Sequence, residues 1–178
     1  MQIVVPDEFQ PLWITDGEHP IVKVPHPALR KVAQPIVKVT KKTQLLADDM
    51  LRIMKRANGV GLAAPQLGVD QRIIVIAPMD YRPMALINPV ITKMEGEVSG
   101  TEGCLSLPGL YGSVKRAHYV EVDCLDRRGR EITIELEGMP ARVLQHEVDH
   151  LDGILFIDKV DVATLHWAMP GDQDADAE

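Results

Sequence analysis

Aromatic residues are scarce in this chain: they make up 4% of its 178 residues, whereas hydrophobic residues of all kinds make up 46%. A core with so few rings must be built from valine, isoleucine, leucine, alanine and methionine. The length suits one domain with a single core, because domains cluster near about 100–150 residues. We therefore expect one globular unit with an aliphatic interior.

Cysteine and long apolar runs are also lacking. The two cysteines, Cys104 and Cys124, are too few for a disulfide framework in a chain of this length, which favours a reducing, cytoplasmic location. No apolar run approaches the roughly 18 residues of a membrane span. The N-terminus has neither the basic region nor the apolar region of a signal peptide. The sequence thus predicts no membrane association.

Excess positive charge is the third absence. The chain has 19 lysines and arginines against 26 aspartates and glutamates, and its formal net charge is −7. Proteins that bind nucleic acids need a basic patch or stripe, so we expect no sequence-specific nucleic-acid partner. Aspartate and glutamate are concentrated at the C-terminal end, where segment 169–178 is predicted to be an acidic, disordered tail.

Hydrophobic periodicity predicts two helices. Thr40 is the expected N-cap of the first helix, and Asn58-Gly59 is expected to end it. The second helix is predicted over 141–151, where apolar residues recur at helical spacing. Near the C-terminus, segment 161–167 is a candidate for a short helix.

Short strands account for much of the remaining order. They are predicted at 21–24, 72–77, 85–88, 120–124 and 132–136. The third is expected to end at Pro89, and the last two to form a β-hairpin. Segment 1–20 contains three prolines and looks like an irregular N-terminal extension. Strands and helices that do not alternate as β-α-β units indicate an α+β fold.

The clearest chemical signal is the H-E-x-x-H motif formed by His146, Glu147 and His150. Residues i and i+4 share one face of a helix, so both imidazoles can bind the same metal ion, with Glu147 beside it as a base. Apolar neighbours predict that this helix is buried, so we expect antiparallel strands packed around a central helix that carries the motif. The alternative interpretation is two unrelated surface histidines.

A catalytic metal normally takes three protein ligands and leaves one position for water, so a third ligand is needed. His166 lies downstream, as in many zinc peptidases. Cys104 lies upstream in a loop bounded by glycine and proline, where ligation is favoured over simple burial. Cys124 alternates with polar residues in a predicted strand and is interpreted as a small buried hydrophobe.

Three separated segments resemble the three signature motifs of the peptide deformylase family. GVGLAAPQ at 59–66 is similar to its glycine-rich motif, EGCLS at 102–106 to its cysteine motif, and QHEVDH at 145–150 to its histidine motif. Their order also agrees, and the similarity extends from about residue 21 to about residue 160. The resemblance implies a single catalytic deformylase domain over 21–168.

The resemblance implies the ligand set and the substrate. Cys104, His146 and His150 would bind one metal ion, with Fe(II) as the native metal and Zn(II), Ni(II) or Co(II) able to occupy the site. The substrates would be the N-formyl-methionyl ends of nascent polypeptides, with formate as a product. A transient contact with the ribosome would follow from that substrate.

The resemblance also implies catalytic roles. Glu147 would transfer the proton, while the side-chain amide of Gln66 and the backbone N–H of Leu105 would stabilise the oxyanion. Glu102 would pair with Arg116 in support of the metal ligands, although both could instead be solvated loop charges. Ligating histidines also need acceptors for their second ring nitrogen, and Asp149 is one candidate.

The resemblance places the methionine side chain of the substrate in an apolar pocket. Five residues would line this site: Val60, Gly61, Met139, Arg142 through its aliphatic stem, and Val143. Gly59 and Gly61 would let the backbone approach a peptide closely. The alternative is that Met139 and Val143 are ordinary core residues.

Two features depart from the family pattern: the extension 1–20, and a C-terminal region too short for the long helix found in many members. Ribosome docking through such a helix is therefore not expected.

Two other functions compete with deformylation: a general metallopeptidase, and a non-catalytic metal-binding protein associated with the ribosome. The first leaves Cys104 and the glycine-rich loop unexplained. A non-catalytic protein would be expected to lack Glu147, Gln66 or one of the metal ligands, and each of these residues is present.

Overall fold

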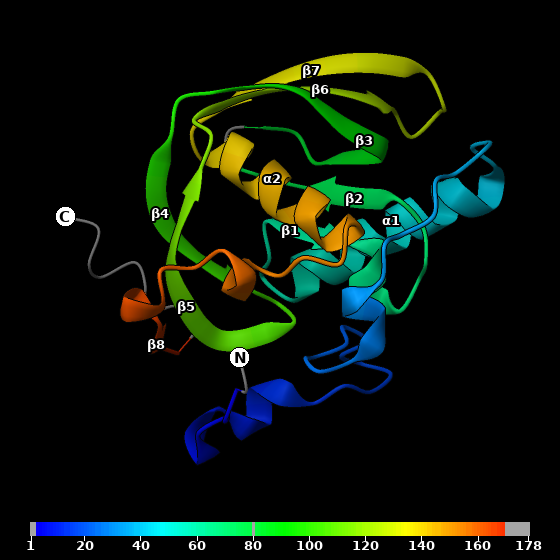
Figure 1. Cartoon of the computed structure of the whole chain (residues 1–178). Helices are drawn as coiled ribbons and strands as arrows, with labels where there is room; N and C mark the ends of the chain where they lie inside the picture. Colours follow the sequence, from blue (N-terminus) through cyan, green and yellow to red (C-terminus); the bar gives the residue numbers. More distant parts are fainter. Residues whose placement is uncertain (1–2, 80, 170–178) are drawn as a thin grey trace.

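The computed structural model describes residues 3–79 and 81–169 (Figure 1). Apart from Met169, the predicted acidic tail lies outside these residues. The α-helices are α1 (Lys41–Arg56) and α2 (Met139–Leu151). The strands are β1 (Gly61–Ala63), β2 (Ile73–Ile76), β3 (Met84–Glu95), β4 (Val98–Cys104), β5 (Leu107–Arg116), β6 (Tyr119–Leu125), β7 (Glu131–Glu137) and β8 (His166–Trp167). Short 3₁₀ helices are η1 (Asp7–Trp13), η2 (Pro27–Arg30), η3 (Ala64–Leu67), η4 (Phe156–Asp158) and η5 (Val162–Thr164).

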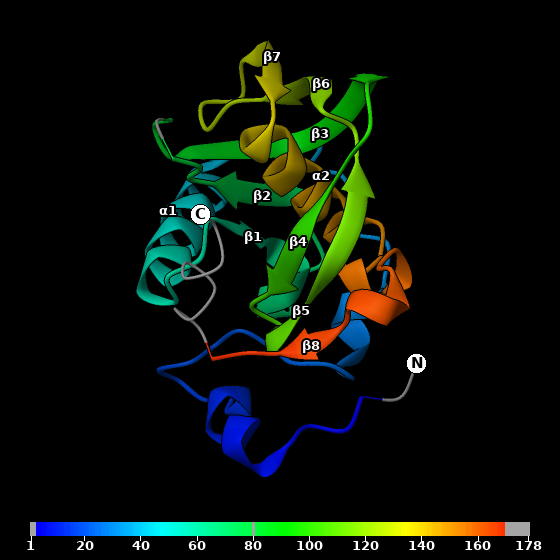
Figure 2. The same cartoon turned by 90° about the vertical axis from the view of Figure 1, so that its left-hand side faces the viewer.

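The strands form two antiparallel sheets on either side of α2. The larger sheet has the order β1-β2-β3-β6-β7, and the smaller one has the order β4-β5-β8. Figures 1 and 2 show α2 lying against the larger sheet, with β4 and β5 along its other side. Every residue of α2 from Ala141 to Leu151 is buried. The predicted α+β fold around a central buried helix is therefore confirmed.

Strand β2 shows how the sequence encodes this layering. Its four residues are all fully buried. Ile74 and Ile76 pack in the core cluster that contains α2, whereas Ile73 and Val75 pack in the cluster that contains α1. A strand covered by a helix on each face is apolar throughout instead of alternating, which explains the continuous apolar run in the sequence.

Helix α1 begins and ends where the sequence predicts. Thr40 forms a reciprocal capping box with Thr43, and the buried face of the helix includes Met50 and Met54. After the helix, Asn58 adopts a left-handed conformation with φ 53°, which stops the helical hydrogen bonding.

The predicted hairpin is confirmed as β6 and β7. In the part of the chain that the structure describes, neither helix is long and apolar enough to cross a membrane.

The prediction that Pro89 ends its strand is wrong. Strand β3 continues to Glu95, and its register with β6 shifts between Ile87 and Val90. Asn88 enables this bulge: its φ is 51°, and its side chain exchanges two hydrogen bonds of 2.8 Å with the backbone of Ile36. A proline is tolerated at a bulge, because the ladder needs no N–H there.

Two other local predictions are wrong. Segment 21–24 is extended but pairs with loops, since the N–H of Val22 donates to Gln66 O at 2.9 Å and that of Val24 donates to Ser106 O at 3.1 Å. Segment 161–167 forms η5 and then β8, whose residues pair with Leu110 and Tyr111 of β5. In both cases contacts distant in sequence decide the conformation.

The N-terminal extension packs on the smaller sheet through η1. Phe9 is 4% exposed, and its ring centroid lies 5.0 Å from that of Trp167. A Cβ at Gly109 would lie 2.5 Å from the Phe9 ring, so this glycine gives the ring its space. The indole N–H of Trp13 donates to Pro108 O at 3.0 Å. The extension is therefore a docked arm.

We expect Phe9→Ala to release this arm. Truncating a buried phenylalanine costs about 3–5 kcal/mol, more than the roughly 1 kcal/mol that one indole hydrogen bond contributes. The exchange rate of the Trp13 indole proton, followed by NMR, should rise. Val4→Ala is the control, because Val4 is 77% exposed. Equal protection of Trp13 in the two variants would contradict the docking role of Phe9.

Candidate metal centre

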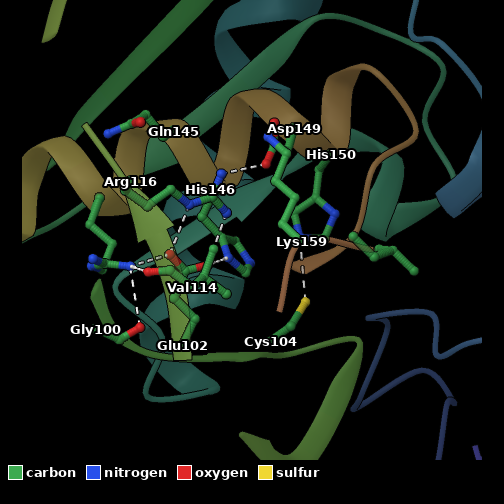
Figure 3. A network of polar contacts seen from close by, with 12 residues as sticks. Gly100, Glu102, Cys104, Val114, Arg116, Gln145, His146, Asp149, His150 and Lys159 are labelled. Carbon is green, nitrogen blue, oxygen red and sulfur yellow. Dashed lines mark hydrogen bonds and ion pairs between the residues drawn. The ribbon is translucent and has the colours of Figure 1, made fainter. Parts of the chain in front are cut away.

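Three side chains converge between α2 and the end of β4. Cys104 Sγ, one ring nitrogen of His146 and one of His150 all lie within 4.8 Å of one another. The Sγ atom lies 3.3 Å from His150 Nε2 (Figure 3). The two rings come from successive turns of α2, and their centroids are 4.9 Å apart. The structure thus brings the two histidines of the motif to the cysteine of a distant strand.

This donor set fits a divalent transition metal. One thiolate and two imidazoles are ligands that zinc and iron accept, and three protein ligands leave a coordination position open. His166, the other candidate for third ligand, does not belong to this group. It lies on β8 with its ring stacked on that of Tyr111, the centroids 6.1 Å apart.

Glu102 contacts His146 through the ring nitrogen Nδ1. Its Oε2 atom lies 2.9 Å from His146 Nδ1, and Arg116 donates to both carboxylate oxygens at 2.8 and 2.9 Å. Burial acts to raise the pKa of Glu102, but hydrogen bonds from Arg116 and His146 outweigh it and lower the pKa to about 2. The predicted pairing of Glu102 with Arg116 is present, and both residues are buried.

Asp149 is not the acceptor for a ligating histidine. Its carboxylate lies 2.5 Å from Arg116 Nη1 and 2.7 Å from Lys159 Nζ. Asp149 therefore accepts from Arg116 Nη1, while Nε and Nη2 of the same arginine donate to Glu102. Among the described atoms, the buried His150 Nδ1 has no hydrogen-bond partner.

Glu147 lies beside the glycine-rich loop. A Cβ at Gly61 would lie 2.2 Å from Glu147 Oε1, so only glycine permits this approach. Glu147 is 5% exposed, and its Oε2 atom has no hydrogen-bond partner among the described residues. Burial raises the pKa of Glu147 to about 7. Such a carboxyl group is suited to accept and return a proton near neutral pH.

Gln66 is held with its amide nitrogen toward the cysteine loop. Its Oε1 atom accepts from the N–H of Ala63 at 2.8 Å. Its Nε2 atom lies 3.2 Å from Ser106 Oγ and 3.6 Å from Cys104 Sγ. The side-chain amide therefore faces the group of ligands, as the sequence interpretation requires.

The cysteine loop packs closely on the glycine-rich loop. A Cβ at Gly59 would lie 2.7 Å from the side chain of Leu105. The N–H of Ser106 lies 3.4 Å from Cys104 Sγ and can stabilise the thiolate. Ser106 belongs to the quoted motif, but nothing in the motif predicts its two contacts with Gln66 and the sulfur.

The residues expected in the methionine pocket occupy different environments. Val60 is 51% exposed and Met139 is 61% exposed. Val143 is buried in the core cluster of α2 and the larger sheet. Arg142 is buried too, and its guanidinium contacts Glu102 and backbone carbonyls. No sequence pattern predicts that the Arg142 guanidinium contacts Glu102, the carboxylate that also contacts His146.

Comparison with known proteins agrees with this geometry. The family model for polypeptide deformylase matches residues 18–165. Peptide deformylase of Symbiobacterium thermophilum is 53% identical over 141 residues, which cover 78% of this chain and 65% of that protein. Peptide deformylase of Halothermothrix orenii is 52% identical over 141 residues, which cover 79% of this chain and 92% of that protein.

Solved structures lead to the same family. The crystal structure of peptide deformylase from Thermus thermophilus has a TM-score of 0.76 and 51% identity, covering 78% of this chain and 83% of that one. The crystal structure of peptide deformylase from Thermotoga maritima has a TM-score of 0.77 and 39% identity, and the match covers 79% of this chain and 96% of that one. With its motifs assembled in space and most of its length matched, the chain belongs to the polypeptide deformylase family.

Proposed function

We propose that this chain is a peptide deformylase, a metal-dependent hydrolase that removes the N-terminal formyl group from formyl-methionyl nascent polypeptides and releases formate. The proposal depends on one observation above all. A cysteine and two histidines lie within 4.8 Å of one another, and the buried Glu147 on the same helix has an oxygen without a partner among the described residues.

Cys104, His146 and His150 would hold one metal ion. When bound, it supplies Lewis acidity toward water and toward a carbonyl oxygen. We propose Fe(II) as the native metal, with Zn(II), Ni(II) or Co(II) able to occupy the site, because a thiolate with two imidazoles suits several of these ions. The chain's own contribution is a rigid, buried helix that presents both imidazoles at a fixed spacing.

Glu147 would be the general base and then the general acid. Its carboxylate takes a proton from the attacking water and delivers it to the amine that leaves. Burial with a raised pKa supports this role, since the group exchanges a proton near neutral pH. Gly61 lets the carboxylate of Glu147 lie directly against the glycine-rich loop, because a Cβ there would lie 2.2 Å from Glu147 Oε1.

Gln66 and Leu105 would stabilise the oxyanion. Fixed donors are effective because they need no reorganisation when charge develops. Gln66 meets this condition, since its oxygen is anchored to Ala63 and only its amide nitrogen faces the sulfur. The N–H of Leu105 follows Cys104 directly in the chain, which favours it as the second donor.

The methionine side chain would lie against Val60, Gly61, Met139, Val143 and the stem of Arg142. The exposure of Val60 and Met139 supports this, because an exposed apolar side chain gains from covering by a ligand. We further propose that 21–168 form the catalytic domain and that 1–20 are an accessory extension, in keeping with the family match over 18–165.

We propose a cytoplasmic location, where nascent chains emerge, and only a transient contact with the ribosome. The arginine-rich turn between β6 and β7 offers little free positive charge for ribosomal RNA. Arg127 pairs with Asp48, and Arg130 pairs with Asp126.

The proposed function is tested by measuring formate release. The chain, loaded anaerobically with Fe(II), should release formate from a formyl-Met peptide and leave an internally cleavable peptide intact. Cleavage of the second peptide instead would indicate a general metallopeptidase. A normal metal content with neither product would indicate the non-catalytic alternative.

We expect Glu147→Ala to lower kcat by about 10²–10⁴-fold, the usual contribution of a positioned acid–base group. Metal content should stay at the wild-type value, because Glu147 is not one of the three ligands. Glu135→Ala serves as the control, since Glu135 is exposed on β7. Turnover retained in Glu147→Ala would refute the assignment.

We expect Cys104→Ala to lose most of its bound metal, because one of three ligands is removed. Cys124→Ala is a matched control: Cys124 is buried, and burial raises the pKa of its thiol to about 11, so it has no thiolate to offer. Metal stoichiometry should therefore fall in the first variant alone. Equal stoichiometry in both would remove Cys104 from the site.

A further inference from the structure

Arg142 lies one helical turn before His146 on α2, and both side chains reach the same carboxylate. Arg142 Nη1 lies 2.8 Å from Glu102 Oε1, while His146 Nδ1 lies 2.9 Å from Glu102 Oε2. Residues i and i+4 share a helix face, so α2 contacts Glu102 at two points. All three residues are buried.

The rest of the Arg142 guanidinium is bound to the smaller sheet. It donates to Val98 O at 2.6 Å and Gly100 O at 3.3 Å on β4, and to Val114 O at 2.8 Å on β5. Figure 3 shows Gly100, Glu102 and Val114 gathered beside α2. Because β4 ends at Cys104, this one side chain links the cysteine strand to the helix that carries both histidines.

The position is shaped for an arginine. A Cβ at Gly100 would lie 3.0 Å from three atoms of the Arg142 guanidinium. At that distance a side chain at position 100 would make the guanidinium shift by a few tenths of an ångström. Gly100 therefore gives Arg142 the space to reach the backbone of β4.

Glu102 has its hydrogen-bonding capacity filled by these partners. Oε1 accepts from Arg116 Nε and Arg142 Nη1, and Oε2 accepts from Arg116 Nη2 and faces His146 Nδ1. An ionised carboxylate can only accept, so His146 must carry its proton on Nδ1. Nε2 is then the ring nitrogen left to face a metal ion.

We propose that Arg142 is a positioning residue of the metal centre. Its guanidinium fixes the position of the Glu102 carboxylate against His146 Nδ1, and it ties the Cys104 strand to α2. The inference rests on the proposed metal site and not on the identity of the substrate. Two roles of Arg142 can be distinguished by substitution. Loss of a residue that lines the methionine pocket should raise KM, whereas loss of a positioning residue should lower metal affinity and kcat.

The test compares Arg142→Met and Arg142→Lys with Arg128→Met. Arg128 is an exposed arginine in the β6–β7 turn and gives a matched control. Zn(II) affinity of the metal-free proteins is measured by competition with a chelator. We expect Arg142→Met to bind Zn(II) about 10- to 100-fold more weakly, as loss of support for a ligating histidine does. Arg142→Lys should recover part of that loss, and Arg128→Met should match the wild type.

A spectroscopic readout separates positioning from general loss of structure. The ¹⁵N shifts of the His146 ring distinguish protonated Nδ1 from protonated Nε2. In the Zn(II)-loaded proteins we expect one set of His146 ring shifts in the wild type and additional sets in Arg142→Met. If Arg142→Met does not fold, Gly100→Ala shifts the guanidinium slightly while keeping its charge, and a smaller loss of Zn(II) affinity in the same direction is expected.

The kinetic readout uses formyl-Met peptide at saturating metal. A lower kcat with KM unchanged supports positioning. Unchanged Zn(II) affinity and unchanged His146 ring shifts, together with a raised KM, would overturn the proposal and make Arg142 a pocket residue. Absence of formate release from the wild type would refute the proposed function alone, because the Zn(II) and NMR results need no substrate.

Discussion

The arrangement of the candidate metal centre depends on one buried carboxylate. Glu102 lies two residues before Cys104 on β4 and accepts hydrogen bonds from β5 through Arg116 and from α2 through Arg142 and His146. An unpaired buried charge costs several kcal/mol, so the folded state favours the arrangement in which every partner is in place. The candidate ligands from β4 and from α2 are thus held near one another by a carboxylate that is not among them.

The helix α2 holds many polar side chains for a buried element. Gln145, His146, Glu147, Asp149 and His150 are all buried within one stretch of it. Buried polar groups are stable only when they are hydrogen-bonded, and the smaller sheet and the segments after α2 supply most of the partners. Among the described residues, the buried atoms left unpaired are Glu147 Oε2 and His150 Nδ1. Glu147 Oε2 lies at the site of the proposed chemistry, whereas His150 Nδ1 is the ring nitrogen that does not face Cys104 Sγ.

Local sequence was sufficient wherever a local rule decides the structure. The cap at Thr40, the buried strand β2, the β6–β7 hairpin and the i, i+4 histidines all follow from spacing. Local sequence was insufficient where distant contacts decide the structure. Buried positions of β4 and β5 hold Glu102, Gly112 and Arg116, so these strands lack the alternation of hydrophobic and polar residues that marks a strand. Asn88 forms a bulge in β3 because its side chain is hydrogen-bonded to the backbone of Ile36. The same limit applies to the site, since the pairing of Asp149 with Lys159 and the reach of Arg142 exist only in three dimensions.

The docked ends of the chain have a consequence for solubility. Strand β5 pairs with β4 along one edge, and its other edge would be open to a strand of another molecule. That edge is covered between Pro108 and Val114 by Trp13, by β8 and by the bridge from Val160. Both terminal segments thus act as a guard against edge-to-edge aggregation, on the very strand that follows the cysteine loop.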